Sequence, residues 1–370
     1  MGLTSFLARR ATRAARVLVV ASPDAFAVRV AAERQVVARG WRLAESPADA
    51  DVLLHVGRVL GEMGEVAGRL WDELPGPRAR VAAEIVAAVP AALDEAAALL
   101  LDESLQTADA AGRTPPDVGA AEDDKGMRDG DMGHGDMGHG DMGDGDMGMD
   151  MTMSPDGIAL ASGSEDDRDG LEMDALPVRL GPVLPHWPAG LVVEATLHGD
   201  VIAEASARWV GSGGGSPAAD DTRLAARACD DLAALLFLAG RGDLANAATA
   251  ARDALVDGRD ADALRFLGTL RRRIVGSRLL RWTLRRTAVL DADRVRRIGL
   301  PPAAAGDCYD RLLTLVERAE DQAAVTPGAA GPALTLDSLG QALLGLDLGA
   351  ARLLIASLGT PAGEVVAVHG

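Results

Sequence analysis

The chain has 370 residues, a formal net charge of −18, 48% apolar residues and only 3% aromatic residues. This length allows two domains, and the apolar content excludes global disorder. The acidic excess is local: residues 121–175 hold 17 acidic and three basic side chains, so −14 of the charge lies there and −4 on the other 315 residues. The net charge therefore says little about the partners of the rest of the chain.

The two cysteines, Cys229 and Cys308, are too few for a disulfide framework or for the four thiolates of an iron–sulfur cluster. Their scarcity fits a reducing compartment. No apolar run reaches the roughly 18 residues that a membrane-spanning helix needs, and the arginine-rich start has no long apolar region or cleavage site of a secretory signal. We expect a cytoplasmic protein that is at most peripheral to the inner membrane.

Strands and helices alternate through the first part of the chain. The predicted strands are 17–21, 51–56 and 79–83, and the predicted helices are 25–39, 62–74 and 89–103. Continuous apolar strands separated by helices are typical of a parallel sheet that is covered on both faces. The pattern predicts an α/β domain with a small parallel sheet over residues 1–106.

The composition changes to Gly, Asp, Met, Ser and Pro over residues 107–172, which we interpret as a disordered acidic linker. A five-residue repeat, Gly-Asp-Met-Gly-His or a close variant, begins at residue 130, and the segment holds eight of the eleven methionines. Such a segment cannot bury enough apolar surface to offset an ordering entropy of roughly 1–2 kcal/mol per residue.

Residues 173–370 predict an α+β domain made of an antiparallel hairpin sheet and a helical bundle. Extended runs at 176–180, 191–198 and 201–210 predict strands, and Gly199-Asp200 predicts a type I′ hairpin turn. The predicted helices that follow are 222–239, 244–256, 260–275 with a basic extension to residue 286, 306–324, and one or two helices within 335–357.

The first domain resembles the 20 kDa subunit of respiratory complex I and the small subunit of nickel–iron hydrogenases. The similarity covers residues 16–83: segment 49–57 resembles a strand of these proteins, and segment 71–78, Trp-Asp-Glu-Leu-Pro-Gly-Pro-Arg, resembles their Tyr-Asp-Gln-Met-Pro-Glu-Pro turn. In that family a cysteine pair after the first strand and two later cysteines hold a cluster. Here Ala21, Ser22 and Pro23 stand at the first position, and no cysteine precedes Cys229.

The second domain resembles the 49 kDa subunit of complex I and the hydrogenase large subunit. Segment 181–190 resembles the Gly-Pro-Gln-His-Pro hairpin of that family, segment 306–311 matches its Gly-Asp-x-Tyr-Asp-Arg helix start, and segment 354–365 resembles its C-terminal segment. The resemblance implies that the chain is a degenerate fusion of the two kinds of subunit.

Residues that serve redox chemistry in the resembled subunits are replaced here. The hairpin histidines that face quinone align with Leu184 and with Pro188 or Ala189, while His186 is displaced. Tyr309 is the only tyrosine and belongs to a later motif, and the two cysteines form no Cys-x-x-Cys pair for nickel and iron. We therefore expect no catalytic residue, no cofactor-binding residue and no cofactor, and whether the chain belongs to an enzyme stays open.

The expected function is that of a non-redox structural subunit in a membrane-associated assembly similar to complex I, NADH-quinone oxidoreductase, or to a hydrogenase. Its expected partners are the other subunits, with no nucleic acid and only indirect membrane contact. Ten arginines and two aspartates within residues 271–297 give that stretch a net charge of +8. Such a basic stretch could contact nucleic acid or anionic lipid. The resemblance favours contact with a subunit or with the acidic linker instead, about as strongly as a solvated helix face that pairs with nearby carboxylates.

The alternative function is a copper-binding chaperone or sensor that acts through the repeat. Thioether and imidazole ligands suit Cu(I), although aspartates at this spacing would equally solvate a plain spacer. The candidate metal ligands are Met132, His134, Met137, His139, Met142 and Met147.

This alternative predicts that the excised segment 130–153 binds Cu(I) more tightly than a scrambled control peptide that lacks methionine. A Cu(I) titration of both peptides measures the difference. Equal affinities would remove the copper hypothesis and leave an acidic spacer.

Overall fold

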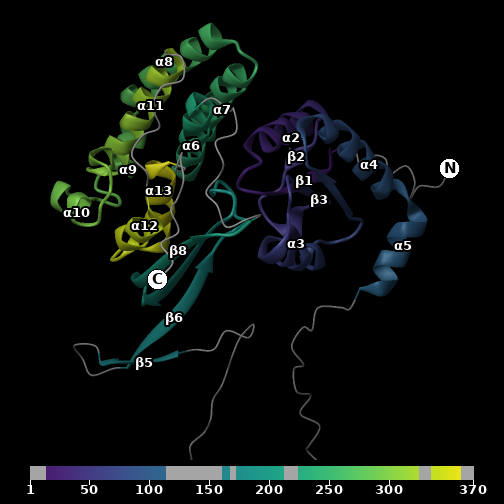
Figure 1. The fold of residues 1–370 in the computed structure, drawn as a ribbon, viewed down its shortest axis with the longest axis horizontal. Coiled ribbons are helices and arrows are strands. Elements are labelled where there is room, and N and C mark those ends of the chain that lie inside the picture. Colours follow the sequence, from purple (N-terminus) through teal and green to yellow (C-terminus); the bar gives the residue numbers. More distant parts are fainter. Residues whose placement is uncertain (1–13, 114–160, 167–171, 212–223, 325–334, 360–370) are drawn as a thin grey trace, which may run out of the picture.

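The computed structural model describes residues 14–113, 161–166, 172–211, 224–324 and 335–359. These residues form an α/β domain and an α+β domain, which confirms the predicted fold class. Figure 1 shows the two domains side by side, with helices α6 (Leu224–Leu238) and α7 (Gly242–Val256) facing helix α2 (Phe26–Ala38) of the first domain.

The first domain is built on a parallel sheet whose described strands have the order β2-β1-β3-β4. The strands are β1 (Arg16–Ala21), β2 (Arg42–Leu43), β3 (Val52–Val56) and β4 (Ala79–Ala83). The other elements are α2, the 3₁₀ turns at Pro47–Asp49 and Val86–Ala88, α3 (Gly61–Glu73), α4 (Val89–Leu101) and α5 (Glu103–Gly112). Four of the five β3 residues are fully buried, which explains why a continuous apolar run predicted a central strand.

Helix α2 is apolar on two faces because it belongs to two cores. Val28, Ala32 and Val36 pack with the sheet and α4, whereas Phe26 and Val30 belong to the core of the second domain. The opposite face of the sheet is covered by α3 together with residues of the second domain. The domains therefore share apolar packing on both sides of the first sheet.

The second domain begins with an antiparallel sheet of order β5-β6-β7-β8 among the described residues. Its strands are β5 (Ala161–Asp166), β6 (Glu172–Leu180), β7 (Leu191–His198) and β8 (Val201–Trp209). The predicted hairpin is present, with His198 opposite Val201, but its predicted turn type is wrong. Type I′ needs positive φ at both central residues, and only Gly199 has it (58°); glycine at this first position is typical of type II′.

A helical bundle follows the sheet. Its elements are α6, α7, α8 (Asp260–Gly276), α9 (Arg278–Leu284), α10 (Ala292–Arg297), a 3₁₀ turn at Pro302–Ala304, α11 (Cys308–Ala324), α12 (Leu336–Leu343) and α13 (Leu348–Leu358). Apolar side chains of α6, α7, α8 and α11 form one core with the inner face of the sheet. Only α10 had no counterpart in the sequence pattern, because a six-residue helix gives too short a periodic signal.

Secondary structure extends into both ends of the segment 107–172 that composition assigned to a linker. Helix α5 continues to Gly112, with Asp102 as its N-cap, and β5 lies at the other end. The buried Arg78 side chain explains the position of α5, since it pairs with Asp109, and Gln106 donates to the Arg78 carbonyl at 2.9 Å. This contact joins residues 31 positions apart, which local composition does not reveal.

His55 lies on β3, and its Nε2 accepts a hydrogen bond from Arg80 Nε on β4 at 3.2 Å. Burial and the adjacent guanidinium lower the pKa of His55 from 6.5 to about 4. Between these values the unfolded chain binds a proton at His55 that the folded chain does not. The stability that this group contributes is therefore complete above pH 6.5 and is lost as the pH falls towards 4.

We predict that His55→Gln reduces the loss of thermal stability between pH 6.5 and 4, because glutamine keeps an acceptor for Arg80 and does not titrate. Melting temperatures of both proteins across this pH range provide the measurement. Parallel curves with the same slope would show that His55 titrates normally in the folded chain.

Candidate functional site between the two domains

Four charged side chains close a ring across the domain interface. Arg29 and Glu33 come from α2, Asp230 from α6 and Arg252 from α7. Each guanidinium contacts both carboxylates: Arg252 Nη1 lies 2.7 Å from Glu33 Oε2 and 2.6 Å from Asp230 Oδ1, and Arg29 Nη1 lies 2.6 Å from Glu33 Oε1 while its Nη2 reaches Asp230. We call these four residues the charge ring.

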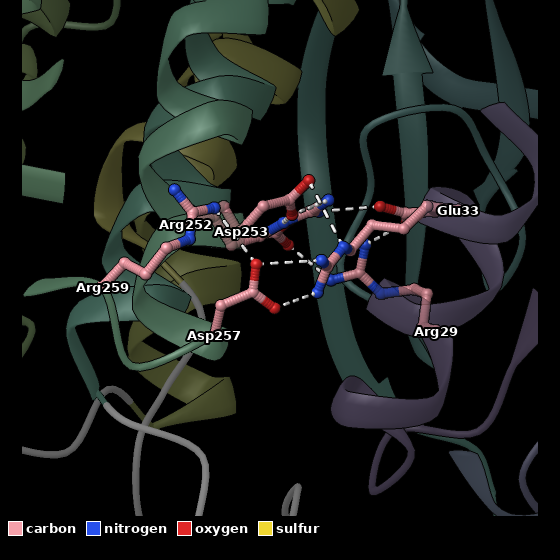
Figure 2. Close-up of polar contacts among 8 residues, drawn as sticks. Arg29, Glu33, Arg252, Asp253, Asp257 and Arg259 are labelled. Carbon is pink, nitrogen blue, oxygen red and sulfur yellow. Dashed lines mark hydrogen bonds and ion pairs between the residues drawn. The ribbon is translucent and has the colours of Figure 1, made fainter. Parts of the chain in front are cut away.

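The sequence places the ring members by helical spacing. Arg29 and Glu33 are one turn apart, so both project from the side of α2 that faces the second domain. Arg252 occupies a position of α7 that its neighbours Ala248, Ala251 and Leu255 mark as buried, and only 3% of its side chain is exposed. Figure 2 shows Arg29 and Glu33 on one side of the interface and Arg252 on the other.

The ring stays ionised although it is largely removed from water. Burial by itself would raise the pKa of Asp230, but Arg29 and Arg252 outweigh that effect and hold this pKa at about 2. Burial would likewise lower the pKa values of Arg29 and Arg252, yet the two carboxylates raise both above their ordinary value. Two positive and two negative charges give the ring no net charge, so pairing offsets the cost of desolvation.

Further ion pairs hold the domains together on either side of the ring. Arg34 on α2 makes a bidentate contact with Asp257, at 2.8 and 3.0 Å, at the end of α7. On α3, Glu62 accepts hydrogen bonds from Arg208 on β8 and Arg179 on β6, and mainly the Arg208 contact lowers the pKa of Glu62 to about 2. These pairs are partly exposed and contribute less per contact than buried ones.

An open cleft of about 1000 Å³ lies between the domains and has the charge ring in its wall. Its other walls are the turn at 21–23, the loop 182–189 and residues of α6 and α7. His186 of the loop has a positive φ of 55°, and its ring stacks on Phe237 with centroids 3.7 Å apart. Desolvation in the cleft lowers the pKa of His186 below its ordinary value of 6.5, so the imidazole is neutral near pH 7.

The loop 182–189 is fixed by contacts at both ends. Trp187 Nε1 donates to the Leu191 carbonyl at 2.7 Å, and Arg352 of α13 donates to the Pro185 carbonyl at 3.0 Å. Gly190 and Gly211 meet Pro23 of the first domain: a Cβ on Gly190 would lie 2.3 Å from Pro23 Cγ, and one on Gly211 would lie 2.7 Å from Pro23 Cδ. Only glycine permits this close approach.

The structure brings together segments that the sequence singled out separately. Ser22 and Pro23 lie against one side of the cleft, and Leu184, His186, Pro188 and Ala189 line the other. Tyr309 lies elsewhere, at the start of α11, where Arg281 and Arg285 stack over its ring. The six candidate copper ligands at positions 132–147 fall outside the described residues, so copper binding stays a prediction.

Both cysteines are buried and have no histidine partner among the contacts of the described residues. Burial raises the pKa of Cys229 to about 12 and also raises that of Cys308, so both are thiols near neutral pH. Within the described ranges, no group of three or more His, Cys, Asp or Glu side chains is placed to hold a metal ion.

The segments 306–311 and 354–358, which were matched separately, meet in a buried contact. Arg311 Nε donates to Ser357 Oγ at 2.7 Å, and its other nitrogens donate to the carbonyls of Ala304, Gly306 and Ala288. Asp307 caps α11 by accepting from the backbone N–H groups of Tyr309 and Asp310. This motif therefore has a structural role in joining helices.

Sequence reasoning missed the charge ring. The signals were present: Arg29 and Glu33 form an i,i+4 pair, and Arg252 interrupts an apolar stripe, where a buried charge needs a partner. The partner could not be identified because it lies 219 positions away in the chain.

Comparison of the chain with family models, curated proteins and solved structures found no match. None of the helices in the described ranges combines the length and apolar character needed to cross a membrane. Chemically, the arrangement locks two domains together and leaves an amphipathic cleft between them, with a neutral imidazole exposed in its wall.

We predict that Arg252→Met destabilises the protein by about 3–5 kcal/mol, because Glu33, Asp230 and Asp253 all lose a partner and Arg29 alone cannot balance the negative charge of this largely buried site. The matched control Arg34→Met breaks a more exposed pair at the same interface and should cost about 1 kcal/mol or less. Urea unfolding measures both, and Arg252→Met should also split one cooperative transition into two.

A second control replaces the whole ring, with Arg29→Met, Glu33→Leu, Asp230→Leu and Arg252→Met in one chain. Removing all four charges takes a partner only from Asp253, which keeps Arg34 at 3.9 Å, so stability should recover relative to Arg252→Met alone. If Arg252→Met costs no more than Arg34→Met, the ring does not hold the domains together.

Proposed function

We propose that the chain is a non-redox structural subunit of a membrane-associated assembly similar to complex I or to a hydrogenase. Its role there is to replace the connecting module that would otherwise pass electrons towards quinone. The proposal includes a peripheral position at the inner membrane and the other subunits of the assembly as partners.

The observation that carries the proposal is the joint between Pro23 and the glycines Gly190 and Gly211. In the resembled subunits, the segment after the first strand holds a cluster and the hairpin presents histidines to quinone. Here the corresponding segments of one chain pack on each other, and Ser22, Pro23, Leu184 and Pro188 offer no thiolate or imidazole at those positions. On this proposal, the packing between the two units is kept while the ligand-bearing side chains are replaced.

The charge ring supports the same proposal. A subunit that transmits no electrons needs a defined relative position of its two domains, so that surfaces on both can meet the same neighbours. A set of paired charges around the buried Arg252 fixes that position, because a shift of the interface would separate Arg29 and Glu33 from Asp230 and Arg252. Copper binding by the acidic Met-rich repeat stays a separate prediction.

We predict that the tagged chain, purified anaerobically from its native membranes, contains no stoichiometric iron or acid-labile sulfide and co-migrates with antiporter-like membrane subunits on native gels. Iron and sulfide assays with identification of the co-migrating subunits by mass spectrometry provide the measurement. A stoichiometric cluster, or a chain that migrates alone, would overturn the proposal.

A matched pair of variants tests whether the joint matters for assembly. Gly211→Ala places a Cβ 2.7 Å from Pro23 Cδ and meets only atoms of Ser22 and Pro23 within 4 Å, whereas Gly240→Ala also has a positive φ and meets no atom within 4 Å. Gly211→Ala should reduce recovery of the chain in the assembly, and Gly240→Ala should not. Equal recovery of the two would show that the joint is dispensable.

A further inference from the structure

Exposed apolar side chains gather where α8 passes into α9. Trp282 is 77% exposed, Leu279 is 59% exposed and Val275 is 47% exposed. Single exposed apolar residues are ordinary on protein surfaces, but a tryptophan and two aliphatic side chains within eight residues form a patch that needs an explanation.

Helix geometry puts Trp282 at the most exposed point of α9. The helix buries Leu280 and Leu284, which lie on one side of it. At about 100° per residue, position 282 points directly away from that side. Arg278 lies one turn before Trp282 on the same outer face, with Leu279 at the edge of that face, whereas Arg281 and Arg285 stack over Tyr309. We call Val275 and residues 278–286 the α9 tip.

Several arginines around the α9 tip have no carboxylate partner among the described residues. Arg285 pairs with Asp310 and Asp307, and Arg271 and Arg273 pair with acidic side chains of neighbouring helices. In contrast, Arg272 donates to the Thr269 hydroxyl and Arg281 to the Val275 carbonyl, and no ion pair joins Arg272, Arg278, Arg281 or Arg286 to a described carboxylate. The nearby Asp291 caps α10, and Asp293 pairs with Arg296.

The α9 tip lies at an end of the molecule. Figure 1 places α9 and α10 at the end of the helical bundle away from the first domain. A protruding surface of this kind can meet a flat partner without interference from the other domain.

We propose that the α9 tip binds the surface of an anionic phospholipid bilayer. Tryptophan favours the interface between headgroups and acyl chains, and arginines beside it pair with lipid phosphates. Nucleic acid would use the arginines but would leave Leu279 and Val275 in water. This contact would be direct, in contrast to the indirect membrane contact expected from the sequence, and it does not depend on membership of a larger assembly.

The test uses flotation of the full chain with vesicles of phosphatidylcholine alone or mixed in equal parts with phosphatidylglycerol. Binding should require the anionic lipid and should weaken as salt is raised, since the charges are exposed. Arg272→Gln, Arg278→Gln and Arg286→Gln combined should weaken binding at least about tenfold. The matched control, Arg42→Gln, Arg58→Gln and Arg69→Gln, removes three exposed charges from the first domain and should not.

Quenching by brominated lipid locates the contact independently of affinity. The quenching should disappear in Trp282→Phe, although Trp41, Trp71, Trp187 and Trp209 remain. Equal loss of binding in the two arginine triples, or unchanged quenching in Trp282→Phe, would overturn the proposal. Binding to RNA or polyglutamate without binding to anionic vesicles would overturn it as well.

Discussion

Pairing of buried charge is the constraint on which this two-domain structure depends. Arg252 is almost completely removed from water, and it is tolerated there because Glu33 and Asp230 accept from it at 2.6–2.7 Å and Asp253 at 3.1 Å. Arg29 closes the ring, so every charge has two opposite neighbours. Helices α2, α6 and α7 each contribute charged side chains to the ring. These polar contacts fix the position at which Phe26 and Val30 of α2 pack into the core of the second domain.

The same principle organises the second domain internally. Arg311 is fully surrounded, and its guanidinium is satisfied by backbone carbonyls and Ser357 instead of a carboxylate. Burial lowers the pKa of this guanidinium. The contact joins the start of α11 to α13, two elements that the sequence motifs identified without indicating that they touch.

The cleft and the α9 tip are two surfaces that the packing of helices and strands leaves uncovered. In the cleft, the domains are held apart around His186 and Phe237 by the loop 182–189, which Arg352 and Trp187 anchor. At the α9 tip, a seven-residue helix buries only two leucines, so most of its residues face outward. The cleft is bounded by both domains, whereas the tip belongs to one.

The sequence by itself determined the order and type of almost all elements, since periodicity and turn residues are local properties. It predicted β7 with its observed bounds, and it placed β1, β3 and β4 in a parallel layer. It did not predict α10, α5, β5 or the turn type at Gly199. Helix α10 is too short for a clear periodic signal, α5 is positioned by the distant Arg78, and β5 lies within a segment whose composition indicated a linker.

The tertiary structure alone decided which of these segments meet. Glu33 and Arg252, Pro23 and Gly190, and Arg311 and Ser357 are all far apart along the chain, and each pair is joined by a contact whose energy depends on burial. Burial and long-range pairing arise only when the elements pack, so a single sequence shows the charges and glycines without their partners. The interface, its cleft and the ionised state of its charges are consequences of packing.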